Sequence, residues 1–184
     1  MRKYVLGVAT VLAASVTGGW FAAPGSSTDG ATVKVKDGQT YAINRYAQEN
    51  LRFVPGTITV TSGSTLAFTF GDKEQEPHTL TVVPKAKLPR TVAQINNCRV
   101  CQQVGTAHLK KPKDLADALT PKNPIVHWTL DKGQPGLDTT GDSLAIHSPG
   151  AHKTNSAVVS APPGTTLYFL CVIHPWMQGR IIVR

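Results

Sequence analysis

Three side chains able to bind a soft metal ion lie within seven residues near the C-terminus, namely Cys171, His174 and Met177. They can converge on one ion only if the backbone turns sharply directly after a strand, and Pro175 favours such a turn because its ring fixes one backbone angle. The alternation over residues 165–171 predicts the strand that delivers the sulfur, with Leu167, Phe169 and Cys171 on one face. After Gly179 a last strand is expected over residues 180–184. The chain must therefore end in two strands joined by a tight loop.

The combination of donors points to copper. A thiolate, an imidazole and a thioether form a soft ligand set, and one more histidine would complete a trigonal His, His, Cys site with a weak axial Met. The segment "EQEPHTLTVV" offers His78 for that role. A single Cys, His or Met on a strand is usually a packed or surface residue. Three compatible donors this close together are hard to assign to packing in a chain with two methionines, one of them the initiator.

At these residues the chain resembles the cupredoxins, the small blue copper proteins, whose ligand loop follows a C-x2-H-x(n)-M pattern. The short version here is most similar to the loop of amicyanin. The resemblance implies that Cys171 and His174 are equatorial ligands, that Met177 is axial and that His78 is the upstream histidine. Cupredoxins often place Asn directly after that histidine. This chain has Thr79 there, which leaves the hydrogen bonding around Cys171 open.

Composition and pattern indicate an all-β fold. The 184 residues fit one domain, and 13 prolines and 16 glycines separate short runs rich in Val and Thr. Together with the resemblance, this predicts a cupredoxin-like Greek-key β-sandwich over residues 31–184, with a partly helical insertion before the last strands. Strands are expected at 31–36, 57–61, 65–70, 78–83, 125–130, 155–160 and the two C-terminal ranges, with 57–61 and 65–70 forming either a hairpin or a crossing between sheets. The range 131–150 reads as turns.

The insertion is expected at about residues 84–122. Thr91 and Gln94 have the spacing of a capping box, and a near-helical repeat of Val, Ile and Cys follows from residue 92 to residue 104. A further short helix is predicted at 113–119. Since 92 residues separate His78 from Cys171, more than a compact cupredoxin needs, we expect this region to cap the sandwich.

The N-terminal residues predict export. Arg2 and Lys3 precede an uncharged apolar run, so residues 1–23 are interpreted as a signal peptide or, if residues 4–23 are not cleaved, as a membrane anchor. Residues 24–30 then form a flexible linker. We expect an extracytoplasmic protein, periplasmic, cell-surface or secreted, that contacts a membrane only through this segment.

The remaining cysteines form the C-x2-C pair Cys98 and Cys101. A local disulfide is the favoured interpretation, a second metal site with His108 is an alternative, and a redox-active dithiol is disfavoured because its βαβ context is missing. Gln102 excludes a c-type haem, which needs His at that position. Cys171 is then left over in an oxidising compartment, where a bound copper ion would protect it. His127, His147 and His152 read as surface or strand residues.

The formal charge of +8 is concentrated in the insertion, which has eight basic and two acidic side chains between Lys85 and Lys122. Such a patch suits an acidic redox partner, although a merely solvated face is at least as good an interpretation. Docking is expected near the loop 174–177 or at the basic insertion, with Pro175 and Trp176 as an electron-transfer patch. Nucleic acid is excluded as a partner because no aromatic residues interleave with these cations.

These features predict a carrier of single electrons between extracytoplasmic redox partners, with one type 1 copper ion. The alternative is an extracytoplasmic copper chaperone or reservoir, which the scarcity of methionine disfavours. An enzyme is not expected. Multicopper oxidases need histidines beside the cysteine, where this chain has Leu170 and Val172, and a binuclear copper site needs a second cysteine in the same loop.

Overall fold

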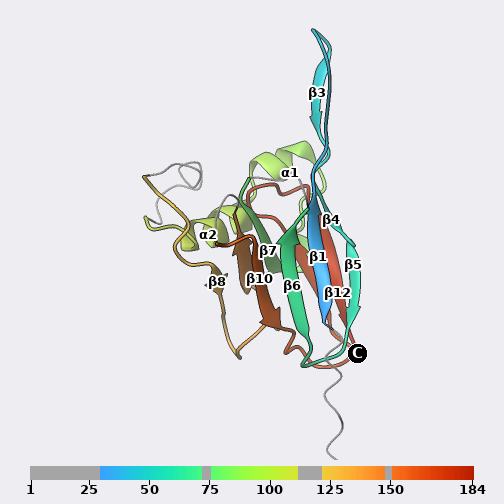
Figure 1. Ribbon diagram of the computed structural model, residues 1–184, viewed down its shortest axis with the longest axis vertical. Helices are drawn as coiled ribbons and strands as arrows, with labels where there is room; N and C mark the ends of the chain where they lie inside the picture. The colour runs from blue at the N-terminus through green and yellow to red at the C-terminus, as the bar shows by residue number, and fades with distance from the viewer. Residues whose placement is uncertain (1–29, 72–75, 112–121, 148–150) are drawn as a thin grey trace, which may run out of the picture.

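The chain folds into a sandwich of two β-sheets with helices beside it (Figure 1). The computed structural model describes residues 30–71, 76–111, 122–147 and 151–184. The chain passes between the sheets five times, at β4–β5, β5–β6, β6–β7, β9–β10 and β10–β11. The predicted all-β sandwich with a partly helical insertion is therefore confirmed.

The first sheet has the strand order β10 (Thr154–Val158), β6 (Thr65–Phe70), β1 (Ala31–Lys36) and β4 (Arg52–Val54). Strand β1 runs parallel to β6 and antiparallel to β4. Period-two alternation sends Val33, Val35, Leu66 and Phe68 inward, and all four are fully buried. The other face of β1 carries exposed residues, which is the pattern of a sheet that is covered on one side.

The second sheet has the order β5 (Thr57–Val60), β12 (Gln178–Val183), β11 (Thr166–Leu170), β7 (His78–Val83), β9 (Ser143–Ile146) and β8 (Thr129–Leu130). All six residues of β7 and all four of β9 are buried. A strand is buried on both faces only if something covers the outer face of its sheet, and here the insertion does so.

Strand β11 divides two hydrophobic cores. Leu167, Phe169 and Cys171 belong to the main core between the sheets, while Leu170 joins a smaller core with Cys101 and other residues of the insertion. The predicted shared face of Leu167, Phe169 and Cys171 is confirmed. Full burial of a side chain such as Phe169 contributes about 1.5–3 kcal/mol.

The insertion contains a 3₁₀ turn η1 (Lys85–Lys87) and the helices α1 (Val92–Asn96) and α2 (Arg99–Ala107). The single helical repeat expected from residue 92 to residue 104 is wrong, because the chain leaves the helix at Asn97 and Cys98 starts a new one as its N-cap. The Thr91 hydroxyl caps α1 by accepting a hydrogen bond from the backbone N–H of Gln94 at 3.2 Å. The Gln94 side chain accepts a hydrogen bond from the backbone N–H of Arg90. The helix predicted at 113–119 lies outside the described residues.

Other expectations need correction. The strand predicted over 125–130 is reduced to β8, with Ile125 in an isolated bridge to Leu109. The range 131–150, predicted to be rich in turns, also contains the buried strand β9, which was not predicted. A short strand of this kind has too few residues to show a period, and the sheet rather than local propensity selects it. Strands β5 and β6 belong to different sheets, so the chain crosses between the sheets here and does not form a hairpin.

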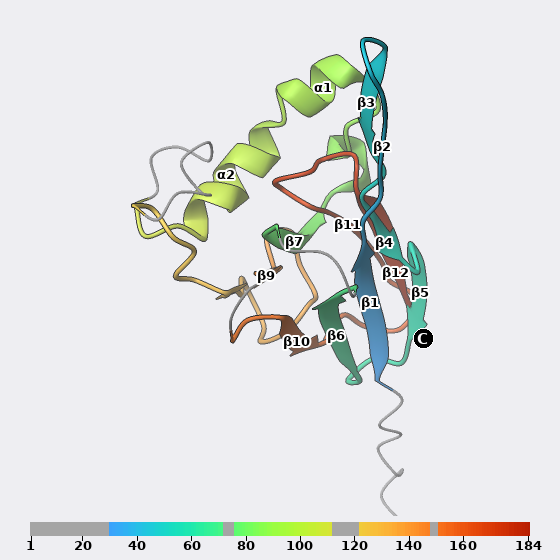
Figure 2. The ribbon, with the colours of Figure 1, turned by 45° about the horizontal axis from the view of Figure 1, so that its top comes forward.

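A hairpin of β2 (Gln39–Ala42) and β3 (Tyr46–Glu49) extends beyond the sandwich (Figures 1 and 2). It exposes the large side chains of Tyr41, Ile43 and Tyr46. Sequence patterns assigned no element here, since neither face is buried. No helix within the described ranges is long and apolar enough to cross a bilayer.

Candidate metal centre

Two neighbouring strands deliver the predicted ligands to one end of the second sheet. His78 is the first residue of β7, and Cys171 directly follows β11, which pairs antiparallel with β7. In antiparallel neighbours the start of one strand lies beside the end of the other. The 92 residues that separate the two ligands in sequence are therefore bridged by a single strand pairing.

His78, Cys171 and His174 form a compact, buried triangle. The Cys171 Sγ lies 3.8 Å from His78 Nδ1 and 3.7 Å from His174 Nδ1, and the two Nδ1 atoms are 3.2 Å apart. His78 and Cys171 are fully buried and His174 is 7% exposed. Across the described part of the chain, this is the one group of three or more His, Cys, Asp or Glu side chains arranged to hold a metal ion.

The size of this triangle fits a first-row metal ion. With zinc bond lengths as a guide, about 2.0 Å to nitrogen and about 2.3 Å to sulfur, a planar three-coordinate ion needs separations of about 3.5 Å between nitrogens and about 3.7 Å between nitrogen and sulfur. The observed separations are close to these values. Two imidazoles and one thiolate with a nearby methionine are the donors of a blue copper site.

The loop from Cys171 to Met177 is closed by its own backbone. The Cys171 amide donates to the Met177 carbonyl at 3.0 Å, and the Met177 amide donates to the His174 carbonyl at 2.8 Å. The Gln178 side chain donates to the carbonyls of Pro175 and Pro89, at 3.0 and 2.8 Å, and so ties the loop to the insertion. Met177 is almost fully buried in the main core. The loop thus brings the fourth predicted ligand near the other three.

Gly179 lies inside β12, opposite Phe169, so the last strand starts at Gln178 and not after Gly179 as predicted. A Cβ at this position would collide with the Phe169 ring and would lie 2.8 Å from the Gly56 carbonyl oxygen. Glycine is needed here for close packing against the strand that carries Cys171.

Thr79 contacts the cysteine loop twice. Its backbone N–H donates to Cys171 Sγ at 3.4 Å, and its hydroxyl oxygen accepts from the Val172 N–H at 2.9 Å. A hydrogen bond to the sulfur tunes a thiolate ligand and orients it. Thr79 therefore supplies a direct link between the two ligand segments.

Burial favours the uncharged forms of His78 and Cys171 in the metal-free protein. Desolvation by burial and, to a smaller extent, the electrostatic effect of His174 lower the pKa of His78 from 6.5 to about 3. Desolvation raises the pKa of the Cys171 thiol, although the backbone hydrogen bond from Thr79 opposes this. A neutral His78 imidazole can bind a cation, and that cation must displace the thiol proton of Cys171.

The outer edge of the site carries a carboxylate and an aromatic ring. His174 Nε2 lies 3.3 Å from Glu76 Oε2, and Glu76 is 54% exposed. The Trp176 ring lies 5.2 Å from the His174 ring and is 41% exposed. Pro175 is buried, so of the two residues predicted to form a patch, Trp176 is the one that faces solvent.

Cys98 and Cys101 form a disulfide with a Cα–Cα separation of 5.2 Å, as favoured from the sequence. The alternative of a second metal site with His108 is wrong, because both sulfurs are bonded to each other. His108 is buried, and both of its ring nitrogens have hydrogen-bond partners. Its Nε2 lies 2.8 Å from Ser143 Oγ, and its Nδ1 is hydrogen-bonded to the His127 carbonyl. His127 is exposed, and His152 stacks on Trp128. Sequence reasoning missed the role of His108, since neither Ser143 nor His127 is near it in the chain.

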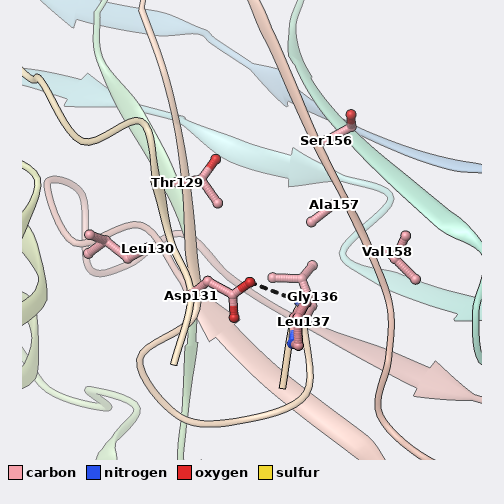
Figure 3. A pocket seen from close by; sticks show the side chains of 9 residues that line it. Thr129, Leu130, Asp131, Gly136, Leu137, Ser156, Ala157 and Val158 are labelled. Atoms are coloured by element: carbon pink, nitrogen blue, oxygen red, sulfur yellow. Dashed lines mark hydrogen bonds between the residues drawn. The ribbon is translucent and has the colours of Figure 1, made fainter. Parts of the chain in front are cut away.

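A cavity of about 280 Å³ lies away from this site, between β8, β10 and the loop that follows β8 (Figure 3). Its one charged side chain, Asp131, accepts from the Gly136 amide at 3.0 Å. A second cavity of about 350 Å³ lies between η1, α1 and the start of α2. Neither cavity contains His78, Cys171 or His174.

A scan against protein-family models finds no match, and neither does a search of curated proteins. Solved structures that resemble this chain include cupredoxins. One is a purple cupredoxin from Nitrosopumilus maritimus, which is 12% identical, covers 84% of this chain and 99% of its own, and has a TM-score of 0.41. Another is auracyanin from Roseiflexus castenholzii, which is 19% identical, covers 87% of this chain and 99% of its own, and has a TM-score of 0.41. A third is an amicyanin variant in the Cu(I) state, with 10% identity over 84% and 82% at 0.39.

Proposed function

We propose that this protein is a type 1 copper protein that carries single electrons between extracytoplasmic redox partners. The observation that supports it most directly is the buried triangle of Cys171 Sγ and the Nδ1 atoms of His78 and His174. The size of the triangle and its donor types match what such a site requires.

The four predicted ligands have separate roles in this proposal. Cys171 would hold the ion as a thiolate, with His78 and His174 completing the plane and Met177 as the weak axial donor that tunes the potential. Copper, when bound, supplies one-electron chemistry by alternating between Cu(I) and Cu(II). The protein's own contribution is to keep these donors in place and to exclude water from them.

The surroundings of the ligands favour electron transfer over storage. Cys171 and His78 are fully buried, and the loop is closed by the hydrogen bonds of Cys171 and Met177. A rigid, dry site changes little between oxidation states, whereas a chaperone or reservoir must exchange its metal with solvent or with a partner. An enzyme is disfavoured because His174 and His78, the two imidazoles of the cluster, are both needed as ligands to one ion.

Electron exchange is proposed at the Trp176 edge. Trp176 and Glu76 are exposed beside His174, so this ligand lies closest to solvent. The insertion carries the exposed cations Lys85, Lys87, Arg90 and Arg99 on the segment 85–99, which contacts the loop through the Pro89 carbonyl and the smaller core. These positive charges suit an acidic partner. They would raise its association rate more than its affinity.

The test is the visible absorption and EPR spectrum of the purified protein after addition of Cu(II). An intense thiolate-to-copper band with a small copper hyperfine splitting is expected. A weak band with ordinary hyperfine splitting would mean that Cys171 is not a ligand, and the reservoir function would then lead.

A further inference from the structure

A row of buried hydroxyl groups connects the cysteine loop to the insertion. The Oγ1 atoms of Thr79 and Thr81 lie 3.0 Å apart, Thr81 Oγ1 lies 2.6 Å from Ser143 Oγ, and Ser143 Oγ lies 2.8 Å from His108 Nε2. All four residues are at most 1% exposed. The row crosses from β7 to β9 and ends at the C-cap of α2.

The donor direction along this row follows from its two ends. At one end the carbonyl of His127 can only accept, so His108 Nδ1 carries a proton. Burial lowers the pKa of His108, so the ring is neutral at physiological pH and its Nε2 accepts. Ser143 must then donate to His108, and with its one proton used it accepts from Thr81.

The same reasoning extends to the cysteine loop. Thr81 donates to Ser143 and therefore accepts from Thr79. Thr79 donates to Thr81, which leaves its lone pairs for the Val172 N–H, at 2.9 Å, a group that can only donate. Every hydroxyl thus points toward His108, and such aligned chains strengthen each member.

We propose that His108 is a positioning residue for the copper site, acting as the terminal acceptor that orients Thr79 and, through it, the Cys171–Val172 peptide. The copper part of this inference rests on the proposed function. Thr79 is the point where the effect reaches the metal, because its N–H donates to Cys171 Sγ. The insertion would thereby have a second role besides covering the sheet, which is to hold the thiolate ligand in a defined orientation.

Two substitutions break the row at different places. His108→Phe removes the terminal acceptor, and Ser143→Ala removes the hydroxyl that accepts from Thr81 and donates to His108. His108→Gln is the conservative variant, since its side-chain amide has N–H donors for the His127 carbonyl and a carbonyl acceptor for the Ser143 hydroxyl. Val104→Ala is the matched control, because Val104 packs from the same helix α2 into the smaller core and makes no side-chain hydrogen bond.

The first readout uses the metal-free protein. Amide hydrogen exchange at Val172 is expected to be about two- to tenfold faster in His108→Phe and Ser143→Ala, the range for loss of one buried hydrogen bond. His108→Gln should exchange like the wild type, and so should Val104→Ala once rates are compared at equal global stability. Equal acceleration in Val104→Ala, or no acceleration in Ser143→Ala, would overturn the proposal. If His108→Phe does not fold, the Ser143→Ala and His108→Gln pair decides the question.

The second readout uses the copper-loaded protein. The reduction potential and the thiolate absorption maximum should shift in the same direction in His108→Phe and Ser143→Ala, with the double variant equal to either single one because both break one row. Additive shifts, or an equal shift in Val104→Ala, contradict the inference. A wild-type protein without the thiolate band would refute the proposed function instead, and the exchange experiment would still decide whether His108 orients the loop.

Discussion

The backbone N–H of Thr79 donates to the Sγ of Cys171 at 3.4 Å, while the hydroxyl of the same threonine accepts from the next amide, that of Val172. One residue therefore contacts both the sulfur and the peptide that leads from it into the ligand loop. Hydrogen bonding of this kind sets the orientation and electron density of a metal-bound sulfur. The properties of the site consequently depend on β7 as much as on the loop that carries three of the four predicted ligands.

Cys171→Ser should abolish the intense visible band, because serine offers no thiolate to couple to copper. Copper affinity should fall by a factor of at least about 10, since a soft donor is lost. Absorption titration with Cu(II) measures both effects. Val172→Ala, one residue further along the loop, is the control for packing and should keep the band. A retained band in Cys171→Ser would refute the assignment of the ligands.

Met177→Leu should keep copper bound but raise the reduction potential. Leucine preserves the apolar volume, while the thioether that stabilises Cu(II) is removed. A shift on the order of 60 mV corresponds to a tenfold preference for one oxidation state in a one-electron couple. Cyclic voltammetry of the loaded protein measures it. An unchanged potential would remove Met177 from the ligand set.

Glu76→Gln should raise the reduction potential, because a negative charge 3.3 Å from His174 Nε2 favours the more positive ion. Glu76 is 54% exposed, and exposed pairs contribute roughly 0.2–1 kcal/mol. The expected rise is therefore at most about 40 mV. Glu49→Gln, on the exposed strand β3, serves as the control and should leave the potential unchanged. A decrease in Glu76→Gln would contradict the electrostatic argument.

The stability of the metal-free protein should fall with decreasing pH below about 6.5. The pKa of folded His78 is about 3 and that of His108 is also lowered, against 6.5 in the unfolded chain. Between these values the unfolded state binds protons that the folded state does not, so each histidine costs up to about 1.4 kcal/mol per pH unit.

Urea denaturation at about pH 6.5 and about pH 5, above the range where most carboxylates titrate, measures this slope. The variant His108→Gln should show a smaller slope because one titrating group is missing. A free energy of unfolding that stays constant or rises over this interval would show that the two buried histidines do not control the acid response.

Gly179→Ala should destabilise the protein by roughly 1–3 kcal/mol, because a Cβ has no room against the Phe169 ring and the Gly56 carbonyl. Gly38→Ala is the control, since its added Cβ would meet Asn50 Cβ at an ordinary 3.5 Å. Chemical denaturation of both variants tests the difference. Equal stabilities would mean that β12 shifts to accommodate the methyl group at little cost.

Much of the sandwich follows from local patterns. Strand β1 and strand β6 have the predicted bounds because their alternation is regular and one face of each is buried. Strand β9 was missed because its four residues, all buried, show no alternation. The break between α1 and α2 was missed because spacing alone does not show that Cys98 caps a new helix while bonded to Cys101.

The kinds of ligand and their spacing follow from the sequence alone. Cys171, His174 and Met177 are close along the chain, so any fold that turns sharply after a strand brings them together. The other contacts of the site arise from the fold. Pairing of β7 with β11 places His78 and Thr79 beside Cys171, and the packing of β9 and α2 connects Thr79 to His108. Local chemistry is visible in the sequence, whereas contacts between distant segments depend on strand order and burial, which no single segment specifies.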